Sequence, residues 1–189
     1  MKKLLLLLFI STTVNLWAQS YSDSIYHFEL TETSCPVFSL YRVARYPGAP
    51  DNVTYGYGFF LRGMWHPGRL LSVGFMSGYI FFANDKLNED HGTSASLSAI
   101  PLQVVVSMQA NSWEIGIGMG SFLLMSTINS GTTAYGTRSE LALTFFTTYF
   151  FNISKDIYIG PELRASYLSF RGIYSLMPSF NIRYNILYY

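Results

Sequence analysis

The chain has 189 residues, of which 12% are charged and 17% aromatic, and its formal net charge is +1. Ordinary soluble domains carry roughly 25% charged residues, so this chain has too little charge to coat a water-facing surface. Its near-neutral balance also gives no electrostatic case for a nucleic-acid partner. The length fits a single domain that is large enough to bury a core.

The first 18 residues predict a secretory signal peptide. The run "MKKLLLLLFI" places two lysines before an apolar stretch, and a more polar stretch then leads to Ala18. This order is typical of a segment that is removed on export. We place cleavage after Ala18, which leaves residues 19–34 as a periplasmic segment ahead of a domain at 35–189. The alternative, an uncleaved helical anchor, needs a longer apolar run of about 20 residues.

Thiol and metal chemistry have little support in the sequence. Cys35 is the only cysteine, so an intramolecular disulfide is impossible. The three histidines, His27, His66 and His91, show no ligand spacing and no neighbouring pair of carboxylates. We therefore predict no metal site and no cofactor.

From residue 53 onward, large apolar side chains alternate with small or polar ones, which is the pattern of strands with two unlike faces. The alternation predicts strands over about 53–66, 69–82, 96–109, 113–120, 139–151 and 157–167, and a last strand in "SFNIRYNILYY". An eighth strand is needed before residue 53, and "PVFSLYRVARY" supplies it, although both of its faces are mixed. A strand that continues to the chain end predicts a structure that closes there.

The connections between these strands alternate in length. Short turns are expected at 66–69, 109–112 and 152–156, and long polar loops at 83–95 and 125–138. In a barrel that crosses a membrane, the short turns face the periplasm and the long loops face outside. Closure of the last strand against the first would satisfy every backbone donor and acceptor.

Two kinds of eight-stranded barrel fit the alternation. A soluble carrier of the lipocalin type would turn its apolar row inward, but the second row here consists of Gly, Ser, Thr and a few charges, which is a poor water-facing surface. With the apolar row facing lipid, the small row fills a narrow lumen. We therefore predict an all-β fold, an eight-stranded antiparallel up-and-down transmembrane β-barrel. Pro101, Pro161 and Pro178 fall inside its strands, where a missing N–H is unfavourable unless the strand bulges.

Aromatic residues gather at both ends of the predicted strands, as the two interfaces of a bilayer select. The predicted belts contain Trp65, Trp113 and Tyr188 near the short turns, and Tyr55, Tyr79 and Tyr167 toward the loops. High strand propensity alone explains the abundance of aromatics but not this clustering.

The inward row predicts a lumen filled by side chains. Its large members are Phe60, Met76, Phe122 and Phe146, and its predicted charge network consists of Arg62, Glu114, Glu140, Glu162, Arg164 and Arg183. We interpret these charges as a salt-bridged network, with a narrow ion path as the alternative. If residues 170 and 175 face each other across the last turn, Glu162 lies opposite Arg183.

Residues 30 to 189 resemble the small eight-stranded outer-membrane proteins of the OmpX and OmpA transmembrane-domain type. The segment "AIPLQVVV" also resembles a strand of the PorT-like outer-membrane β-barrel domain family. The resemblance implies localisation in the outer membrane, with lipid and lipopolysaccharide as neighbours. It also implies a C-terminal signal for the barrel-assembly machinery, at Tyr184, Ile186, Tyr188 and Tyr189, although the apolar row ends one residue before the terminus.

Three functions remain open for such a barrel. The first is a non-enzymatic structural or surface-interaction protein that binds an unidentified partner through its outer loops. The second is a component of an envelope secretion or assembly complex, which only the PorT-like resemblance supports. The third is an enzyme acting on membrane lipid, for which His91 with Ser94 or Ser96 is the only candidate group, with no acid clearly placed beside it.

Overall fold

The computed structural model describes residues 26–41, 53–67, 70–88, 93–129, 132–169 and 172–188. Its strands are β1 (His27–Tyr41), β2 (Val53–His66), β3 (Leu71–Asn88), β4 (Thr93–Ala110), β5 (Trp113–Asn129), β6 (Thr133–Tyr149), β7 (Phe151–Ser154), β8 (Ile157–Leu168) and β9 (Ile173–Tyr188). The described residues include no helix long and apolar enough to cross a membrane.

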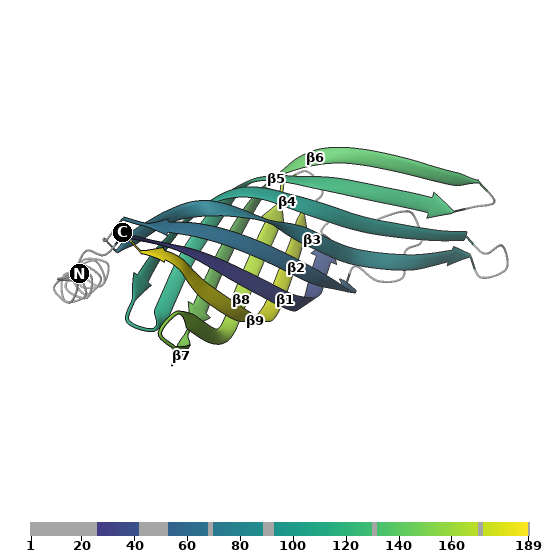
Figure 1. The fold of residues 1–189 in the computed structure, drawn as a ribbon. Coiled ribbons are helices and arrows are strands. Elements are labelled where there is room, and N and C mark those ends of the chain that lie inside the picture. The colour runs from purple at the N-terminus through teal and green to yellow at the C-terminus, as the bar shows by residue number, and fades with distance from the viewer. Residues whose placement is uncertain are drawn as a thin grey trace, which may run out of the picture.

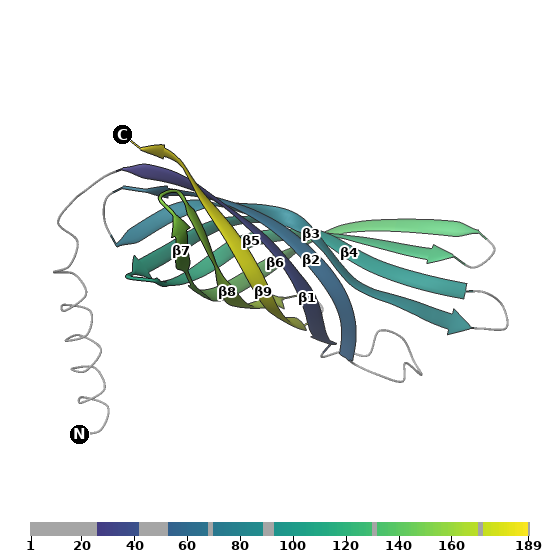
Figure 2. The ribbon, with the colours of Figure 1, turned by 60° about the horizontal axis from the view of Figure 1, so that its bottom comes forward.

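The strands form one closed antiparallel barrel (Figures 1 and 2). Each of β1 to β5 pairs with the next strand, β9 pairs with β1 and β8, and the pairing of β6 with β8 completes the circle. β7 continues β6 after Phe150, and both pair with β8, so together they make one stave of the barrel. The barrel therefore has eight staves, which confirms the predicted fold class and the closure of the last strand against the first.

The first strand begins earlier than predicted. β1 starts at His27, so residues 27 to 34, which we expected to precede the barrel, pair with both β2 and β9. The alternation pattern did not reveal this part of the strand, because its outward positions include Glu32 and Ser34 instead of an unbroken apolar row. Both of these residues are exposed. Pairing on two sides holds the segment in the sheet despite its mixed pattern. Residues 42–46 of the predicted strand lie outside the described part of the chain.

The two long polar loops are largely strands as well. β3 and β4 stay paired out to Asn88 and Thr93, and β5 and β6 stay paired out to Asn129 and Thr133. The prediction of loops at 83–95 and 125–138 is therefore wrong over most of their length. Outside a bilayer a strand needs a pairing partner but no apolar face, so its sequence loses the alternation that reveals the other strands.

The short turns lie at the opposite end of the barrel, beside the first residues of β1. The chain reverses at Asn111 and Ser112 and again at Lys155 and Asp156. Asn111 has a φ of 54°, a left-handed conformation that asparagine tolerates better than most residues. We call this the turn end of the barrel and the opposite one the loop end.

The two faces of the barrel wall follow the predicted inside-out arrangement. Large apolar side chains point outward on every stave; Tyr55, for example, is 72% exposed and Leu141 68%. The lumen is filled instead. Phe60, Met76, Phe122 and Phe146 are at most 1% exposed, and further apolar side chains fill its loop half, including Ile80, Phe82, Leu124, Leu168 and Ile173.

Two prolines face each other where β1 meets β9. These strands are paired at Ser34 with Phe180 and at Phe38 with Leu176, but at none of the positions between, where the same register sets Pro36 opposite Pro178. Neither proline has an N–H to donate, so the ladder is broken at this point. The seam between β1 and β9 therefore lacks pairing over residues 35–37 of β1 and 177–179 of β9.

Candidate functional site

A network of ion pairs crosses the turn half of the lumen. Arg62 of β2 reaches Glu114 of β5, with 3.1 Å between Nη2 and Oε2, and Glu162 of β8, with 3.4 Å between Nη1 and Oε2. Arg164 pairs with Glu162 at 2.6 Å, and Arg183 of β9 pairs with Glu114. These five side chains, at most 3% exposed, come from four staves, so the structure brings together five of the six charges assigned to the lumen.

The sixth predicted charge lies apart from this network. Glu140 is buried toward the loop end, where its Oε1 lies 3.8 Å from Arg138 Nε. The sequence missed another member, Glu29 of β1, whose Oε2 lies 3.2 Å from Arg183 Nε. Glu29 was missed because we placed its segment outside the barrel. The polar alternation of Glu29, Thr31 and Thr33, all buried, is the signal that could have found it.

The predicted pairing of Glu162 with Arg183 is wrong. The last hairpin closes with Leu168 opposite Ile173, which sets Glu162 opposite Ser179 and Arg183 opposite Tyr158. The assumed turn was therefore misplaced by four in register. Glu162 still lies between two guanidiniums: Arg164 reaches it from the same face of β8, and Arg62 reaches it across the lumen.

Hydrogen bonds and aromatic rings complete the packing around these charges. Glu162 Oε2 accepts hydrogen bonds from Thr148 Oγ1 at 2.9 Å and from Asn181 Nδ2 at 2.7 Å. Each arginine of this network also stacks on a phenylalanine. The distance from the guanidinium carbon to the ring centroid is 4.1 Å for Arg62 on Phe146, 4.0 Å for Arg164 on Phe60, and 3.6 Å for Arg183 on Phe150. Stacking of a guanidinium on a ring is favourable in a desolvated site. The arrangement is that of a packed plug.

The small residues of the inward row make room for this plug. A side-chain carbon placed on Gly116 of β5 would overlap the ring of Phe146, which lies directly opposite on β6. The alternation of glycine with large residues therefore has a packing reason inside the lumen.

The predicted aromatic belts lie on the outer wall. At the turn end Trp65 and Trp113 are 38% and 48% exposed, and the Trp113 ring contacts Tyr149 edge to face at 5.0 Å. At the loop end Tyr55 contacts Phe38 at 5.6 Å and Tyr167 contacts Tyr174 at 4.8 Å. Tyr79 also points outward and is 38% exposed.

Residues of the predicted assembly signal lie on the last strand. Tyr184 and Ile186 point outward and are exposed. The backbone of Tyr188 pairs with His27, while its side chain and all of Tyr189 lie outside the described part of the chain. The role of these residues in assembly stays a prediction.

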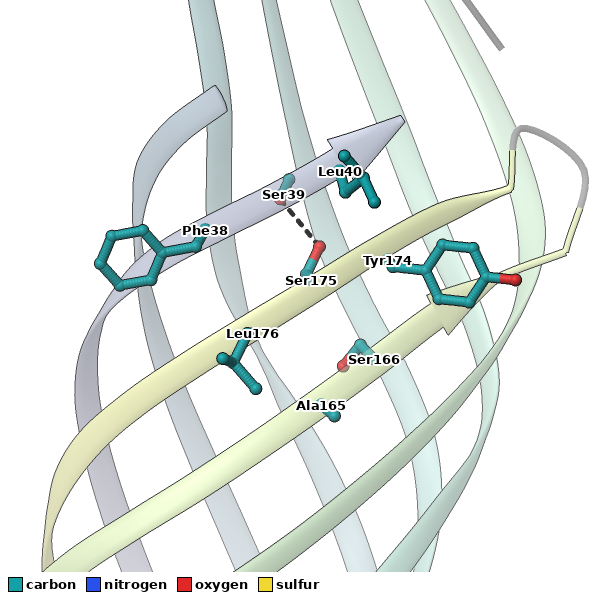
Figure 3. Close-up of a pocket in the computed structure, with 8 residues that line it drawn as sticks. All are labelled: Phe38, Ser39, Leu40, Ala165, Ser166, Tyr174, Ser175 and Leu176. Carbon is teal, nitrogen blue, oxygen red and sulfur yellow. Dashed lines mark hydrogen bonds between the residues drawn. The ribbon is translucent and has the colours of Figure 1, made fainter. Parts of the chain in front are cut away.

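A shallow groove of about 330 Å³ lies on the outer wall at the loop half of the seam (Figure 3). Phe38 and Leu40 of β1, Tyr174 and Leu176 of β9, and Ala165 of β8 line this groove. The other lining residues are three serines, two of which, Ser39 and Ser175, are hydrogen-bonded at 2.8 Å. The lining contains no acid or histidine. His91, on which the enzyme hypothesis depends, lies outside the described residues.

Four strands continue beyond the rest of the barrel at the loop end, as the upper right of Figure 1 shows. β2 pairs with β3 only as far as Phe81, and β8 pairs with β6 only from Ala142, whereas β3, β4, β5 and β6 stay paired with one another beyond these points. We call this extension the protruding sheet. On β6, residues 133–140 pair with β5 alone among the described strands, and residues 132–139 are exposed.

Comparison with protein-family models and with curated proteins finds no match. Solved structures that share the fold include the following three. Neisserial surface protein A has a TM-score of 0.59 at 11% identity, with 87% of this chain and 100% of that chain covered. Ail of Yersinia pestis, in complex with a heparin analogue, has a TM-score of 0.58 at 10% identity, covering 87% and 100%. A major outer membrane protein from Thermus thermophilus has a TM-score of 0.57 at 11% identity, covering 82% and 99%. The resemblance to small outer-membrane barrels is thus confirmed for the fold; the PorT-like resemblance gains no family match.

Proposed function

We propose that this protein is a non-enzymatic outer-membrane barrel that binds a partner outside the cell through its protruding sheet. The observation that carries the proposal is the outer edge of β6 at residues 133–137, which pair with β5 and with no other strand of the described structure. An unpaired strand edge offers a row of N–H and C=O groups to an extended segment of another protein. The partner we expect is therefore a polypeptide that can add a strand.

The barrel suits the role of a membrane anchor for this sheet. Its apolar outer wall suits hydrocarbon, and its filled lumen leaves no room for a diffusion pore. Solved structures that share the fold include Neisserial surface protein A, Ail and a major outer membrane protein. The name and ligand of Ail describe that protein; for this chain they support only the general idea of a barrel that acts through its exposed end.

Proline substitutions on β6 test the edge. Successive residues of a strand direct their N–H groups to opposite sides. Of the variants Gly136→Pro and Thr137→Pro, one therefore removes an outward N–H and the other removes a hydrogen bond to β5. Cells that display the wild type or a variant at equal surface level would be assayed on a panel of immobilised extracellular proteins. We expect binding to be lost in the variant that blocks the outward edge.

A matched variant separates the edge from the sheet face. Tyr135→Ser removes a side chain that is 81% exposed but leaves the backbone donors intact, so binding should persist. Loss of binding with Tyr135→Ser and not with either proline would assign recognition to the face. Recovery of a stoichiometric envelope protein from mild detergent, with no binding on the panel, would favour a secretion or assembly complex.

A further inference from the structure

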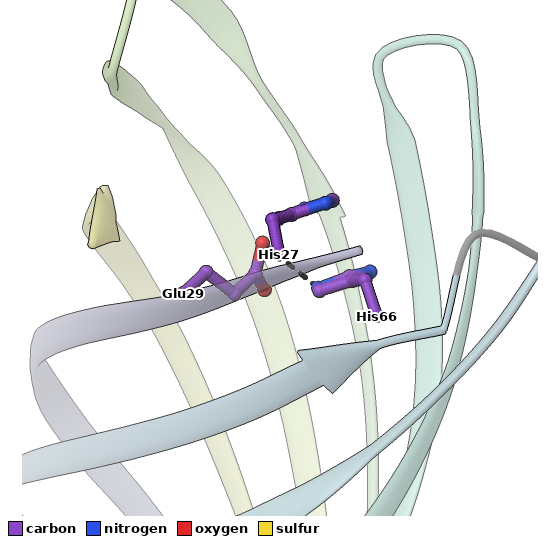
Figure 4. Close-up of side chains that lie close together, drawn as sticks. All are labelled: His27, Glu29 and His66. Carbon is purple, nitrogen blue, oxygen red and sulfur yellow. Dashed lines mark ion pairs between the residues drawn. The ribbon is translucent and has the colours of Figure 1, made fainter. Parts of the chain in front are cut away.

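Two histidines that are 39 positions apart in the chain meet at the turn end of the lumen (Figure 4). His27 opens β1 and His66 ends β2, and the two are directly paired in the antiparallel register. Their rings stack with centroids 4.3 Å apart. Glu29 follows two residues after His27 and therefore points from the same face of β1. The three side chains form a group that the sequence spacing did not reveal.

The ligand atoms of this group are close enough to share one ion. One atom each from His27, Glu29 and His66 lies within 4.8 Å of the others, and His66 Nε2 is 3.0 Å from Glu29 Oε2. Zinc binds such atoms at roughly 2.0 to 2.2 Å, which sets two ligands of one ion about 3 to 3.5 Å apart. His66 and Glu29 already have this spacing. His27, half-buried at the strand start, has to approach by a side-chain rotation.

A hydroxyl fixes the orientation of His66. Ser72 Oγ of β3, which is buried, lies 2.5 Å from His66 Nδ1. A ligand histidine usually donates its second N–H to such a partner. When Nδ1 donates to Ser72, the Nε2 lone pair of a neutral His66 faces the Glu29 carboxylate. Two lone pairs at this distance require a proton or a cation between them.

The carboxylate has coordination capacity left. Glu29 is fully buried, and neither of its oxygens makes a hydrogen bond within the described structure. Arg183 Nε lies 3.2 Å from Oε2 and offsets its charge, which weakens any cation site here. Arg183 also pairs with Glu114 and donates from Nη1 to Gln109 Oε1 at 3.1 Å, so it has other acceptors if Glu29 turns to a metal.

We propose that His27, Glu29 and His66 bind a divalent transition-metal ion, of which Zn²⁺ fits the ligands best. Two imidazoles and one carboxylate are a known zinc ligand set, whereas Ca²⁺ and Mg²⁺ prefer oxygen alone. Three protein ligands leave a position open to water. The ion would join β1 to β2 beside the strand that closes the barrel, at the end where the chain enters it.

Zinc titration of the purified, folded barrel without a polyhistidine tag tests the site. A chromophoric chelator in competition would report stoichiometry and affinity, and Co²⁺ would report the ligand field by its visible absorption. We expect one ion per barrel. His27→Asn, His66→Asn and Glu29→Gln each remove a ligand and should each lower the zinc affinity at least about tenfold. Ser72→Ala removes only the orienting hydroxyl and should also lower the affinity about tenfold or more.

His91→Asn is the matched control, because it removes the remaining histidine of the chain and should bind like the wild type. Heat-dependent gel mobility would show that each variant is folded before its affinity is compared. No stoichiometric binding by the wild type, or equal binding by folded His27→Asn and His66→Asn, would overturn the proposal. Loss of binding in His91→Asn alone would assign the metal to another part of the chain.

Discussion

Arg62 reaches Glu162 across the lumen, with 3.4 Å between Nη1 and Oε2, although 100 residues separate them in the chain. Glu162 also pairs with Arg164 at 2.6 Å. Neutralising this carboxylate removes the ion pair of Arg164 and leaves Arg62 paired with Glu114. The stability of the barrel therefore depends on this residue more than its single charge would indicate.

We predict that Glu162→Gln lowers the free energy of unfolding by about 1 to 3 kcal/mol, below the ~3 to 5 kcal/mol cost of breaking a fully dry pair, because the amide keeps part of the hydrogen bonding. Urea unfolding of the refolded barrel measures this. A double-mutant cycle with Arg62→Met should give a coupling energy above roughly 0.5 kcal/mol. The cycle with Arg183→Met is the control and should give a smaller value, since Arg183 pairs with Glu114 and Glu29 instead. Equal coupling in both cycles would contradict the observed register.

The facing prolines predict a weak seam. Pro36→Val with Pro178→Val restores two N–H donors, so it should raise the free energy of unfolding by about 1 kcal/mol. Cys35, the buried sole cysteine beside Pro36, reports seam opening directly. Its alkylation by a lipid-soluble maleimide should become several-fold slower in the double variant.

A second thiol position controls for opening elsewhere. Ala142→Cys in a Cys35→Ser background puts a thiol in the lumen at a residue that is paired on both sides, with Gly120 and Leu168. It should react more slowly than Cys35 and be unaffected by the proline changes. Equal rates at the two positions would show that the whole barrel opens rather than the seam.

The topology predicts which insertions antibodies can reach. An epitope after Asn88 or Gly131 extends the loop end and should be labelled on intact cells. An epitope between Lys155 and Asp156 lies at the turn end, beside the start of β1, and should be labelled only after permeabilisation. The reverse pattern would mean that the barrel is inserted in the other orientation.

The closed barrel predicts heat-dependent mobility. Unheated protein should migrate differently from boiled protein in detergent gels, because the staves of the closed barrel are hydrogen-bonded to neighbours on both sides over most of their length. The protein should also fractionate with the outer membrane. Recovery as a soluble periplasmic monomer would exclude the membrane interpretation.

A lipid-modifying activity would need His91 in its only candidate group. We predict that lipid A from cells with His91→Ala is identical by mass spectrometry to lipid A from wild-type cells. The comparison with cells lacking the protein is the control. A modification present in wild-type cells and absent from both others would overturn the non-enzymatic proposal.

The sequence by itself determined the fold class and the orientation of the wall. A two-residue period is a local property, so Tyr55, Leu141 and their neighbours could be assigned to the outside, and Arg62 and Phe146 to the lumen, before any pairing was known. Length, charge and turn spacing then limited the fold to one closed barrel of eight staves. These inferences needed no knowledge of which strand residues face each other.

Only the tertiary structure decided which residues meet. Register depends on where each hairpin closes, and an error of four positions moved Glu162 from Arg183 to Ser179. Pairing across the lumen and between β1 and β2 is equally non-local, so neither Arg62 with Glu162 nor His27 with His66 could be read from spacing. The protruding sheet was not predicted for a different reason. A strand with water on both faces is stabilised by its backbone hydrogen bonds, so its side chains need not alternate between apolar and polar.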